Sequence, residues 1–305
     1  MATTTSSTTP AAGRRSVLPP AVRVLFGVFK LRIGVVIAVT ALAGAALQPG
    51  AALSWGQGLV LFFGTLLAAA SAGAFNQYYE VDLDARMRRT RMRPFVSGRL
   101  ARRAGWLPLI VAIALVGVVA CALALNLLAA VFTFLGAFFY GVVYTVWLKR
   151  RTWWNIVIGG AAGSFAVLAG AAAVSPQMSI QAWLFAVILF LWTPPHFWSL
   201  AIVCRDDYAA AGVPMLPVVK GDAIAARAIL AHVVVLVALS WVLIAWIPGW
   251  LYGAAAIGGG LYFIQAALRL VRAPTRENAR LCFRASLMQL SLLLLGALLD
   301  AALLA

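Results

Sequence analysis

The segment 76–84 carries three oxygen-bearing side chains at helical spacing. Asn76, Glu80 and Asp84 follow one another at intervals of four residues. On a continuous helix they would spread over only about 80° and share one face, while Asp82 would point away. Mg²⁺ is bound by such hard oxygen ligands, typically one or two carboxylates together with substrate phosphates. The spacing therefore predicts a metal site; the alternative is a solvated, salt-bridged helix end.

A second acidic segment, Asp206-Asp207-Tyr208, lies more than 100 residues further on. Basic residues follow the first acidic segment and recur near position 150. The preference for positive charge on the cytoplasmic side of a membrane could explain them without any ligand. Arginine forks and metal ions together can also hold a diphosphate and stabilise it as a leaving group. The interleaved acids favour this second interpretation. The basic residues expected to contact a diphosphate are Arg89, Arg93, Lys149 and Arg150.

A third candidate group is His196, which follows Pro194 and Pro195 inside an apolar segment. Two prolines in mid-helix remove backbone hydrogen bonds and predict a kink. An ionisable side chain within a membrane segment is a functional candidate by default. The alternative is a histidine that is hydrogen-bonded in the core.

The elements that must position these residues are membrane-spanning helices. The chain has 305 residues, of which 64% are apolar and only 10% charged, too few to cover the surface of a soluble domain. Apolar runs of about 20 residues match the length that a helix needs to cross a bilayer. The predicted fold is an all-α polytopic membrane bundle of nine transmembrane helices. The predicted spans are 31–48, 57–79, 105–125, 128–147, 154–175, 180–203, 227–247, 249–268 and 284–303.

Charge predicts the orientation of this bundle. All 24 lysines and arginines lie before the first span, in connections or at the ends of spans, and all on one side, which places the N-terminus in the cytoplasm. Seven of the eight acids lie on the same side, and only Asp300 does not. Acids contribute little to orientation, so this bias indicates a function on that side. The net charge of +16 also favours anionic membrane lipid, and we expect no nucleic-acid binding.

Two domain-level predictions complete this picture. Residues 1–20 are rich in serine and threonine and are expected to form a disordered tail, followed by a single transmembrane domain over 21–305. We expect an inner (plasma) membrane location. The acid-free, serine-rich tail also allows the alternative of a transit peptide and the mitochondrial inner membrane.

Three stretches resemble one known family. They are FNQYYEVDLDARMRRTRMRPFVSGRL at 75–100, YTVWLKRRTWWNIVIGG at 144–160 and LWTPPHFWSLAIVCRDDYAAAGVPMLPVVKG at 191–221. They are similar to the UbiA superfamily of intramembrane prenyltransferases, and within it to the protoheme IX farnesyltransferase (haem O synthase) branch. The chain departs from the usual motif NDxxDxxxD at Gln77 and Glu80. Neither Asp206 nor Asp207 has an acid four residues on, which is typical of this branch.

The resemblance implies a UbiA-type bundle around a central cavity. It implies transfer of a farnesyl group from farnesyl diphosphate to the 2-vinyl group of haem B with addition of water, giving haem O and diphosphate. His196 would then contact haem, as an axial ligand or a hydrogen-bond partner, with Tyr208 as a second haem-binding residue. Haem A synthase or oxidase-assembly proteins are implied as partners. The residues that would act in catalysis and bind Mg²⁺ are Asn76, Glu80, Asp84, Asp206 and Asp207.

An allylic cation formed in such a reaction needs a water-free chamber lined by aromatic rings. The expected lining residues are Phe75, Tyr78, Tyr79, Phe138, Tyr140 and Tyr144.

Three rival interpretations remain open at this point. A quinone- or chlorophyll-type aromatic prenyltransferase would use another acceptor. A secondary transporter also presents kinked helices and paired sites, although its ionisable groups would lie at the middle of the membrane. A non-catalytic haem-binding or assembly protein would need no Mg²⁺ site.

Overall fold

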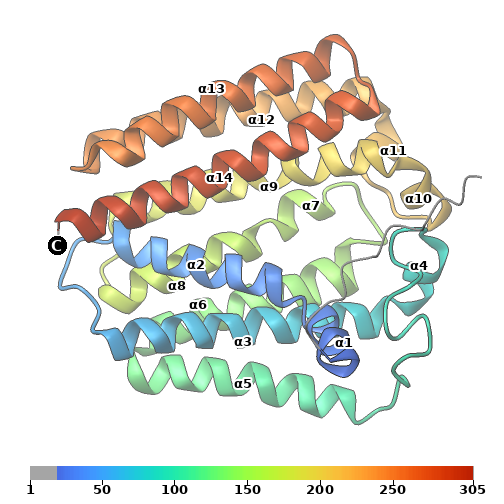
Figure 1. Ribbon diagram of the computed structural model, residues 1–305, viewed down its shortest axis with the longest axis horizontal. Helices are drawn as coiled ribbons and strands as arrows, with labels where there is room; N and C mark the ends of the chain where they lie inside the picture. The colour runs from blue at the N-terminus through green and yellow to red at the C-terminus, as the bar shows by residue number, and fades with distance from the viewer. Residues whose placement is uncertain (1–18, 305) are drawn as a thin grey trace, which may run out of the picture.

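The computed structural model describes residues 19–304, which form helices and no β-strand (Figure 1). The predicted disordered tail 1–20 lies outside the described residues except for Pro19 and Pro20, where α1 (Pro20–Val28) begins. Eight helices are long and apolar enough to cross a membrane, and the bent pair formed by α1 and α2 (Leu31–Leu47) supplies a ninth. The prediction of nine spans is therefore confirmed.

The helices agree closely with the predicted spans. After α2 come α3 (Trp55–Tyr79), α5 (Trp106–Ala124), α6 (Leu127–Phe138) with the π-helical η1 (Phe139–Leu148), and α7 (Asn155–Gly159) with α8 (Ala161–Val174). The remaining spans are α9 (Ile180–Val203), α12 (Asp222–Leu243) with the 3₁₀ turn η2 (Ile244–Trp246), α13 (Trp250–Arg272) and α14 (Arg276–Leu304). Three short helices connect spans: α4 (Val81–Arg86), α10 (Arg205–Ala210) and α11 (Leu216–Lys220).

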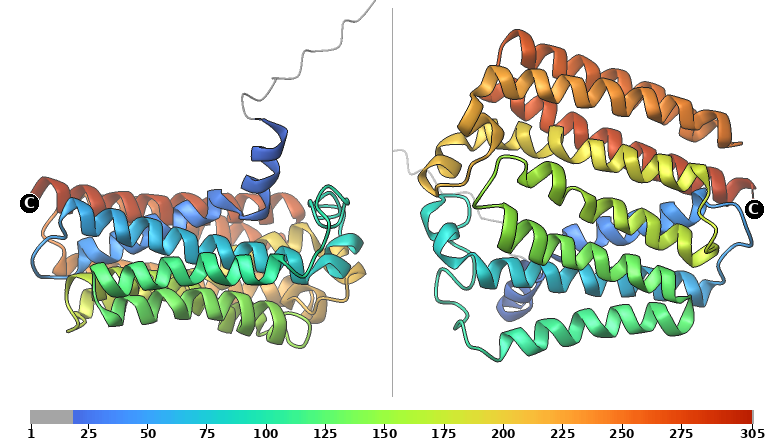
Figure 2. Two further views of the ribbon diagram at one scale, coloured as in Figure 1. Left: turned by 90° about the horizontal axis from the view of Figure 1, so that it is seen from below. Right: turned by 180° about the vertical axis from the view of Figure 1, so that it is seen from behind.

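The two ends of the bundle differ in charge. The spans run side by side, and α4, α10 and α11 lie together at one end with the basic connections (Figure 1). The uncharged connections and the end of α14 lie at the opposite end (Figures 1 and 2). We call the first the basic end. Both acidic segments are located there, as the prediction that seven of the eight acids share one side requires.

Close packing within the bundle depends on small residues. A Cβ atom at Gly170 of α8 would overlap the carbonyl group of Ala41, and one at Gly44 of α2 would overlap that of Val167. Such small residues let helix backbones approach closely, which is how membrane helices associate without a hydrophobic driving force. Many large apolar side chains face outward; Leu123 is 84% exposed and Trp250 is 75% exposed. This exposed apolar surface is what a lipid environment requires.

The one acid away from the basic end has a structural role. Asp300 of α14 is 3% exposed. Its carboxylate accepts hydrogen bonds from the backbone N–H groups of Leu251 (3.1 Å) and Tyr252 (2.8 Å), in the first turn of α13. An acid there satisfies helix N–H groups that have no partner within the helix. Asp300 therefore joins α14 to the start of α13.

The two prolines of α9 do not end the helix. α9 continues through Pro194 and Pro195 as one helix of 24 residues. α8, α12 and α14 pack alongside it. A membrane helix tolerates proline where neighbouring helices cover the freed backbone groups. His196 therefore has a fixed position on a continuous helix.

Candidate active site

The predicted row of oxygen ligands is present on one face at the basic end. α3 ends at Tyr79, and Glu80 links it to α4 with φ −94°. Backbone hydrogen bonds from Glu80 to Asn76 (3.0 Å) and from Asp84 to Glu80 (2.8 Å) keep the four-residue repeat across this junction. Asn76, Glu80 and Asp84 are each at most 2% exposed. Asp82 points away into solvent, as expected from its place in the helical repeat.

Each member of this row is paired with a basic side chain. Lys149 Nζ lies 2.5 Å from Glu80 Oε2, and Arg93 Nη1 lies 2.6 Å from Asp84 Oδ2. Lys30 Nζ donates to Asn76 Oδ1 at 2.7 Å. Each carboxylate uses one oxygen for its cation, and Glu80 Oε1 is buried without a hydrogen-bond partner. Such an unpaired buried oxygen is costly unless a ligand satisfies it.

Lys30 is a site residue that the sequence analysis treated only as an orientation charge. It lies between α1 and α2 with φ 48°, the only non-glycine residue with positive φ among those described. Its Nζ also donates to the Tyr140 hydroxyl at 2.8 Å. A Cβ atom on Gly73 would lie 3.3 Å from the Lys30 side chain, so the glycine leaves room for it. In the sequence, only Gly73, one helical turn before Asn76, indicated that another side chain packs closely at this point of α3.

The π-helical segment η1 supplies the opposite wall. Lys149 N–H donates to the Tyr144 carbonyl, five residues back, at 2.9 Å. Thr145 Oγ1 donates to the Tyr140 carbonyl and accepts from Asn76 Nδ2 at 3.0 Å. The wider π-helical turn thereby directs Tyr140, Thr145 and Lys149 toward the acidic row. π-helical turns of this kind are frequent at functional sites.

The second acidic segment meets the first through Asp207. Asp207 Oδ2 accepts a hydrogen bond from the backbone N–H of Arg89 at 3.3 Å. Tyr208 is buried and interacts electrostatically with Arg89 and Glu80; burial raises the pKa of its hydroxyl. Asp206 points outward, where Arg276 of α14 donates to it at 2.6 Å. The fold thus places Asp207 beside the loop that follows α4 and Tyr208 near Glu80, and it directs Asp206 to the surface.

The four predicted diphosphate-binding cations occupy different settings. Lys149 and Arg93 hold the buried carboxylates, and Arg89 contacts Asp207 through its backbone with an exposed side chain. Arg150 forms two 2.8 Å hydrogen bonds to Asp82 near the surface. The hydrogen bond from Arg150 lowers the pKa of the Asp82 carboxyl. All four lie at the basic end.

Four of the six residues expected to line an aromatic chamber form two stacked pairs. Tyr140 and Tyr144 stack at 5.7 Å, with Lys30 Nζ and Lys149 Nζ over their respective rings. Phe75 stacks on Tyr79, and both belong to the last turn of α3. Tyr78 packs against Phe95, in the same cluster as Phe75, and Phe138 is 39% exposed beside Phe134. The role of all six as lining residues stays a prediction.

His196 forms a separate site within the bundle. Its ring is stacked between Trp192 (4.3 Å between centroids) and Phe283 (4.6 Å). Nδ1 lies 2.8 Å from Ser286 Oγ on α14. Tyr208, the second predicted haem-binding residue, is not among these contacts and lies toward Glu80 instead. Because both ring faces of His196 are covered, any ligand must approach the ring edge.

The donor set at the first acidic row suits a hard divalent cation. Within residues 19–304, no three His, Cys, Asp or Glu side chains gather as a metal-binding group, and Glu80 and Asp84 are paired with Lys149 and Arg93. The donors are nevertheless oxygens of the kind that Mg²⁺ prefers, and Glu80 Oε1 has no partner. A diphosphate with its metal would take up both the free oxygens and the surrounding cations. The residues therefore fit such a ligand.

This arrangement defines a class of protein. At one end of the nine spans lies a cluster of two buried carboxylates, a buried amide and three cations, which is suited to a metal-bound diphosphate. These features are the ones that an intramembrane prenyltransferase would need. The profile of the UbiA prenyltransferase family matches residues 37–293, and the chain belongs to this family.

Curated relatives of high similarity are protoheme IX farnesyltransferases. The chain is 51% identical over 278 residues to a protein of Paramagnetospirillum magneticum named protoheme IX farnesyltransferase 2, covering 91% of this chain and 96% of that one. It is 46% identical over 240 residues to the protoheme IX farnesyltransferase of Gloeobacter violaceus, covering 77% of each.

Solved structures share the fold. A UbiA homologue from Aeropyrum pernix matches with a TM-score of 0.73 at 20% identity, covering 87% of this chain and 98% of that one. A UbiA homologue from Archaeoglobus fulgidus, described as bound to DMAPP and Mg²⁺, matches with a TM-score of 0.70 at 16% identity, covering 91% and 99%. The predicted UbiA-type fold is therefore confirmed.

Proposed function

We propose that this chain transfers the farnesyl group of farnesyl diphosphate to the 2-vinyl group of haem B, with addition of water, to give haem O and diphosphate. The observation that carries the proposal is the pair of buried carboxylates, Glu80 and Asp84, each held through one oxygen by a basic side chain. The names of the relatives support haem B as acceptor over a quinone or chlorophyll precursor. The location of the charged groups at one end disfavours a transporter, and the buried carboxylates disfavour a non-catalytic haem carrier.

The first step breaks the bond between the farnesyl C1 and the diphosphate oxygen, and the electron pair leaves with the diphosphate. Lys149, Arg93 and Lys30 stand around the position where this negative charge develops. Preorganised cations stabilise such charge strongly, because they need no reorganisation during the reaction. Arg89 and Arg150, nearer the surface, would bind the outer phosphate.

The farnesyl C1 then bonds to the terminal carbon of the vinyl group, and positive charge passes to the carbon attached to the macrocycle. One water adds to that carbon and loses a proton, which gives the hydroxyl group of the product. Tyr140 and Tyr144 stack beside the cations and offer ring faces to the allylic cation. Their position also keeps water away from it until the vinyl group attacks.

Mg²⁺ is the proposed cofactor, and when bound it supplies further charge neutralisation to the diphosphate oxygens. The solved homologue described as bound to DMAPP and Mg²⁺ supports this assignment. Asn76, Glu80, Asp84 and Asp207 are the better supported ligands, because Asp206 is exposed and paired with Arg276.

His196 is the proposed haem contact. With Nδ1 engaged by Ser286 and both faces stacked, its Nε2 edge is the part available to ligate iron or to donate a hydrogen bond. We further propose a plasma (inner) membrane location with the basic end in the cytoplasm. Haem A synthase or oxidase-assembly proteins stay predicted partners.

The test is a reconstitution assay. Purified protein in lipid nanodiscs is incubated with farnesyl diphosphate, Mg²⁺ and either haem B or 4-hydroxybenzoate, and product masses are recorded. We expect haem O from haem B and no prenylated benzoate. An Arg272→Gln variant, changed at an exposed position on α13, serves as a matched control with unchanged turnover. Prenylated benzoate, or no product with either acceptor, would contradict the proposal.

A further inference from the structure

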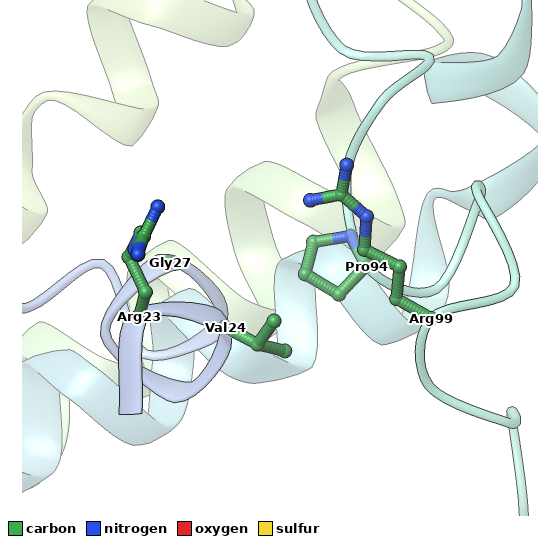
Figure 3. A pocket seen from close by; sticks show the side chains of 5 residues that line it. All are labelled: Arg23, Val24, Gly27, Pro94 and Arg99. Carbon is green, nitrogen blue, oxygen red and sulfur yellow. The ribbon is translucent and has the colours of Figure 1, made fainter. Parts of the chain in front are cut away.

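A hollow separate from the acidic row lies between α1 and the loop that follows α4. Its volume is about 380 Å³, and it is lined by Arg23, Val24 and Gly27 of α1 and by Pro94 and Arg99 of the loop. Figure 3 shows Arg23 and Val24 on the α1 side of the hollow and Pro94 and Arg99 on the side of the loop. A Cβ atom on Gly27 would meet nothing within 4 Å, so the space beside this glycine is open.

The surroundings of this hollow place it beside lipid. The chain bends by 51° between α1 and α2, and Figure 2 shows α1 projecting sideways from the bundle at the basic end. Leu25 and Phe26 of α1 are 43% and 47% exposed, as side chains that enter a membrane interface would be. A helix with exposed apolar residues next to arginine is suited to the boundary between headgroups and acyl chains.

We propose that the hollow binds the phosphate headgroup of an anionic phospholipid. The two arginines would form charge-assisted hydrogen bonds with the phosphate oxygens from either side. Val24 and Pro94 would contact the glycerol and the first acyl carbons. A cytoplasm-facing leaflet supplies such lipid and draws basic residues toward it.

A lipid bound here would also steady the active site. The carbonyl groups of Gly27 and Val28 accept hydrogen bonds from Gln77, which is next to Asn76. Pro94 follows Arg93, which holds Asp84. The headgroup would therefore join the two elements, α1 and the loop, that deliver Lys30 and Arg93 to the acidic row.

The experiment measures lipid binding by the full-length protein. Protein reconstituted in vesicles with equal amounts of phosphatidylglycerol and phosphatidylcholine is extracted in mild detergent, and bound lipid is counted by native mass spectrometry. We expect selective retention of phosphatidylglycerol. Arg23→Gln and Arg99→Gln should each weaken it by about five-fold, as expected for one basic residue at a charged interface. Arg272→Gln, which removes one charge elsewhere at the basic end, should leave retention unchanged.

The variant Gly27→Leu tests the role of the space in the hollow independently of the charge of the two arginines. It keeps both arginines but fills the space, and its helix should form at least as well because glycine is a poor helix former. We expect it to lose phosphatidylglycerol as the arginine variants do. Equal retention by wild type and by the Arg23/Arg99 double variant would overturn the proposal, as would equal loss in Arg272→Gln. Displacement of the lipid by inorganic phosphate or farnesyl diphosphate at equal concentration would assign the hollow to a soluble phosphate or to the substrate instead.

Discussion

The ion pair between Glu80 and Lys149 offers the sharpest prediction, because it separates a catalytic role from a structural one. Glu80 is fully buried and Lys149 is 9% exposed. Removing one partner of a buried pair leaves an uncompensated charge and typically costs about 3–5 kcal/mol. We expect Lys149→Met to cost more than Glu80→Met, because the stranded carboxylate has no access to water, whereas a stranded lysine retains some.

The double variant Glu80→Met/Lys149→Met should recover most of this stability. Replacing both members of a buried ion pair by apolar side chains of similar volume is often neutral or stabilising. Turnover should not recover, since Lys149 is proposed to stabilise the charge on the leaving diphosphate. Loss of one such preorganised donor typically lowers kcat by about 10²–10³-fold.

The assay pairs the thermal unfolding midpoint in mild detergent with the rate of haem O formation. Asp222→Asn is the matched control, because it breaks the looser and partly exposed pair with Arg205 (3.5 Å) at the same end. Such a pair typically contributes about 0.2–1 kcal/mol, so both readouts should change little. Wild-type turnover in the Glu80/Lys149 double variant would refute the reasoning and leave the pair with a purely structural role.

Further predictions concern the other acids, the haem contact and the metal. Asp207→Ala should abolish haem O formation, whereas Asp206→Ala, at an exposed position, should lower it only slightly; equal losses would contradict the placement of the two carboxylates. His196→Ala should weaken haem binding, measured by absorbance titration, and leave farnesyl diphosphate binding intact; loss of both would indicate misfolding. Asp300→Ala should lower the thermal midpoint through a loss of about 1–2 kcal/mol, as for other helix caps, and leave kcat unchanged. Chelation by EDTA should stop turnover without changing the far-UV circular dichroism, and added Mg²⁺ should restore it.

Hydropathy and charge were sufficient to predict the architecture. Apolar runs of span length predicted the nine spans, and the one-sided distribution of basic residues predicted which connections share an end. Both signals follow from the bilayer, which excludes charge and requires each backbone group to be paired within a helix. The start of α14 at Arg276 was missed because a charged helical turn outside the membrane has no hydropathy signal.

The site was predicted in part. Helical spacing found Asn76, Glu80 and Asp84, because that repeat survives the junction between α3 and α4. Helical spacing could not predict Lys30, because its position depends on its own left-handed backbone conformation and on the bend between α1 and α2. It also treated Asp206 and Asp207 alike, since adjacent residues differ only in the direction that the short helix α10 gives them. These features depend on tertiary structure and cannot be predicted from the spacing of residues in one sequence.

The most direct measurement is a structure of the protein with Mg²⁺ and the unreactive analogue farnesyl thiodiphosphate. The account predicts that the two phosphorus atoms lie between the row Asn76–Glu80–Asp84 and Asp207, with Lys149 and Arg93 turned from their carboxylates toward phosphate oxygens. A diphosphate bound on the outer face beside Asp206 and Arg276, with the buried ion pairs of Glu80 and Asp84 intact, would contradict it.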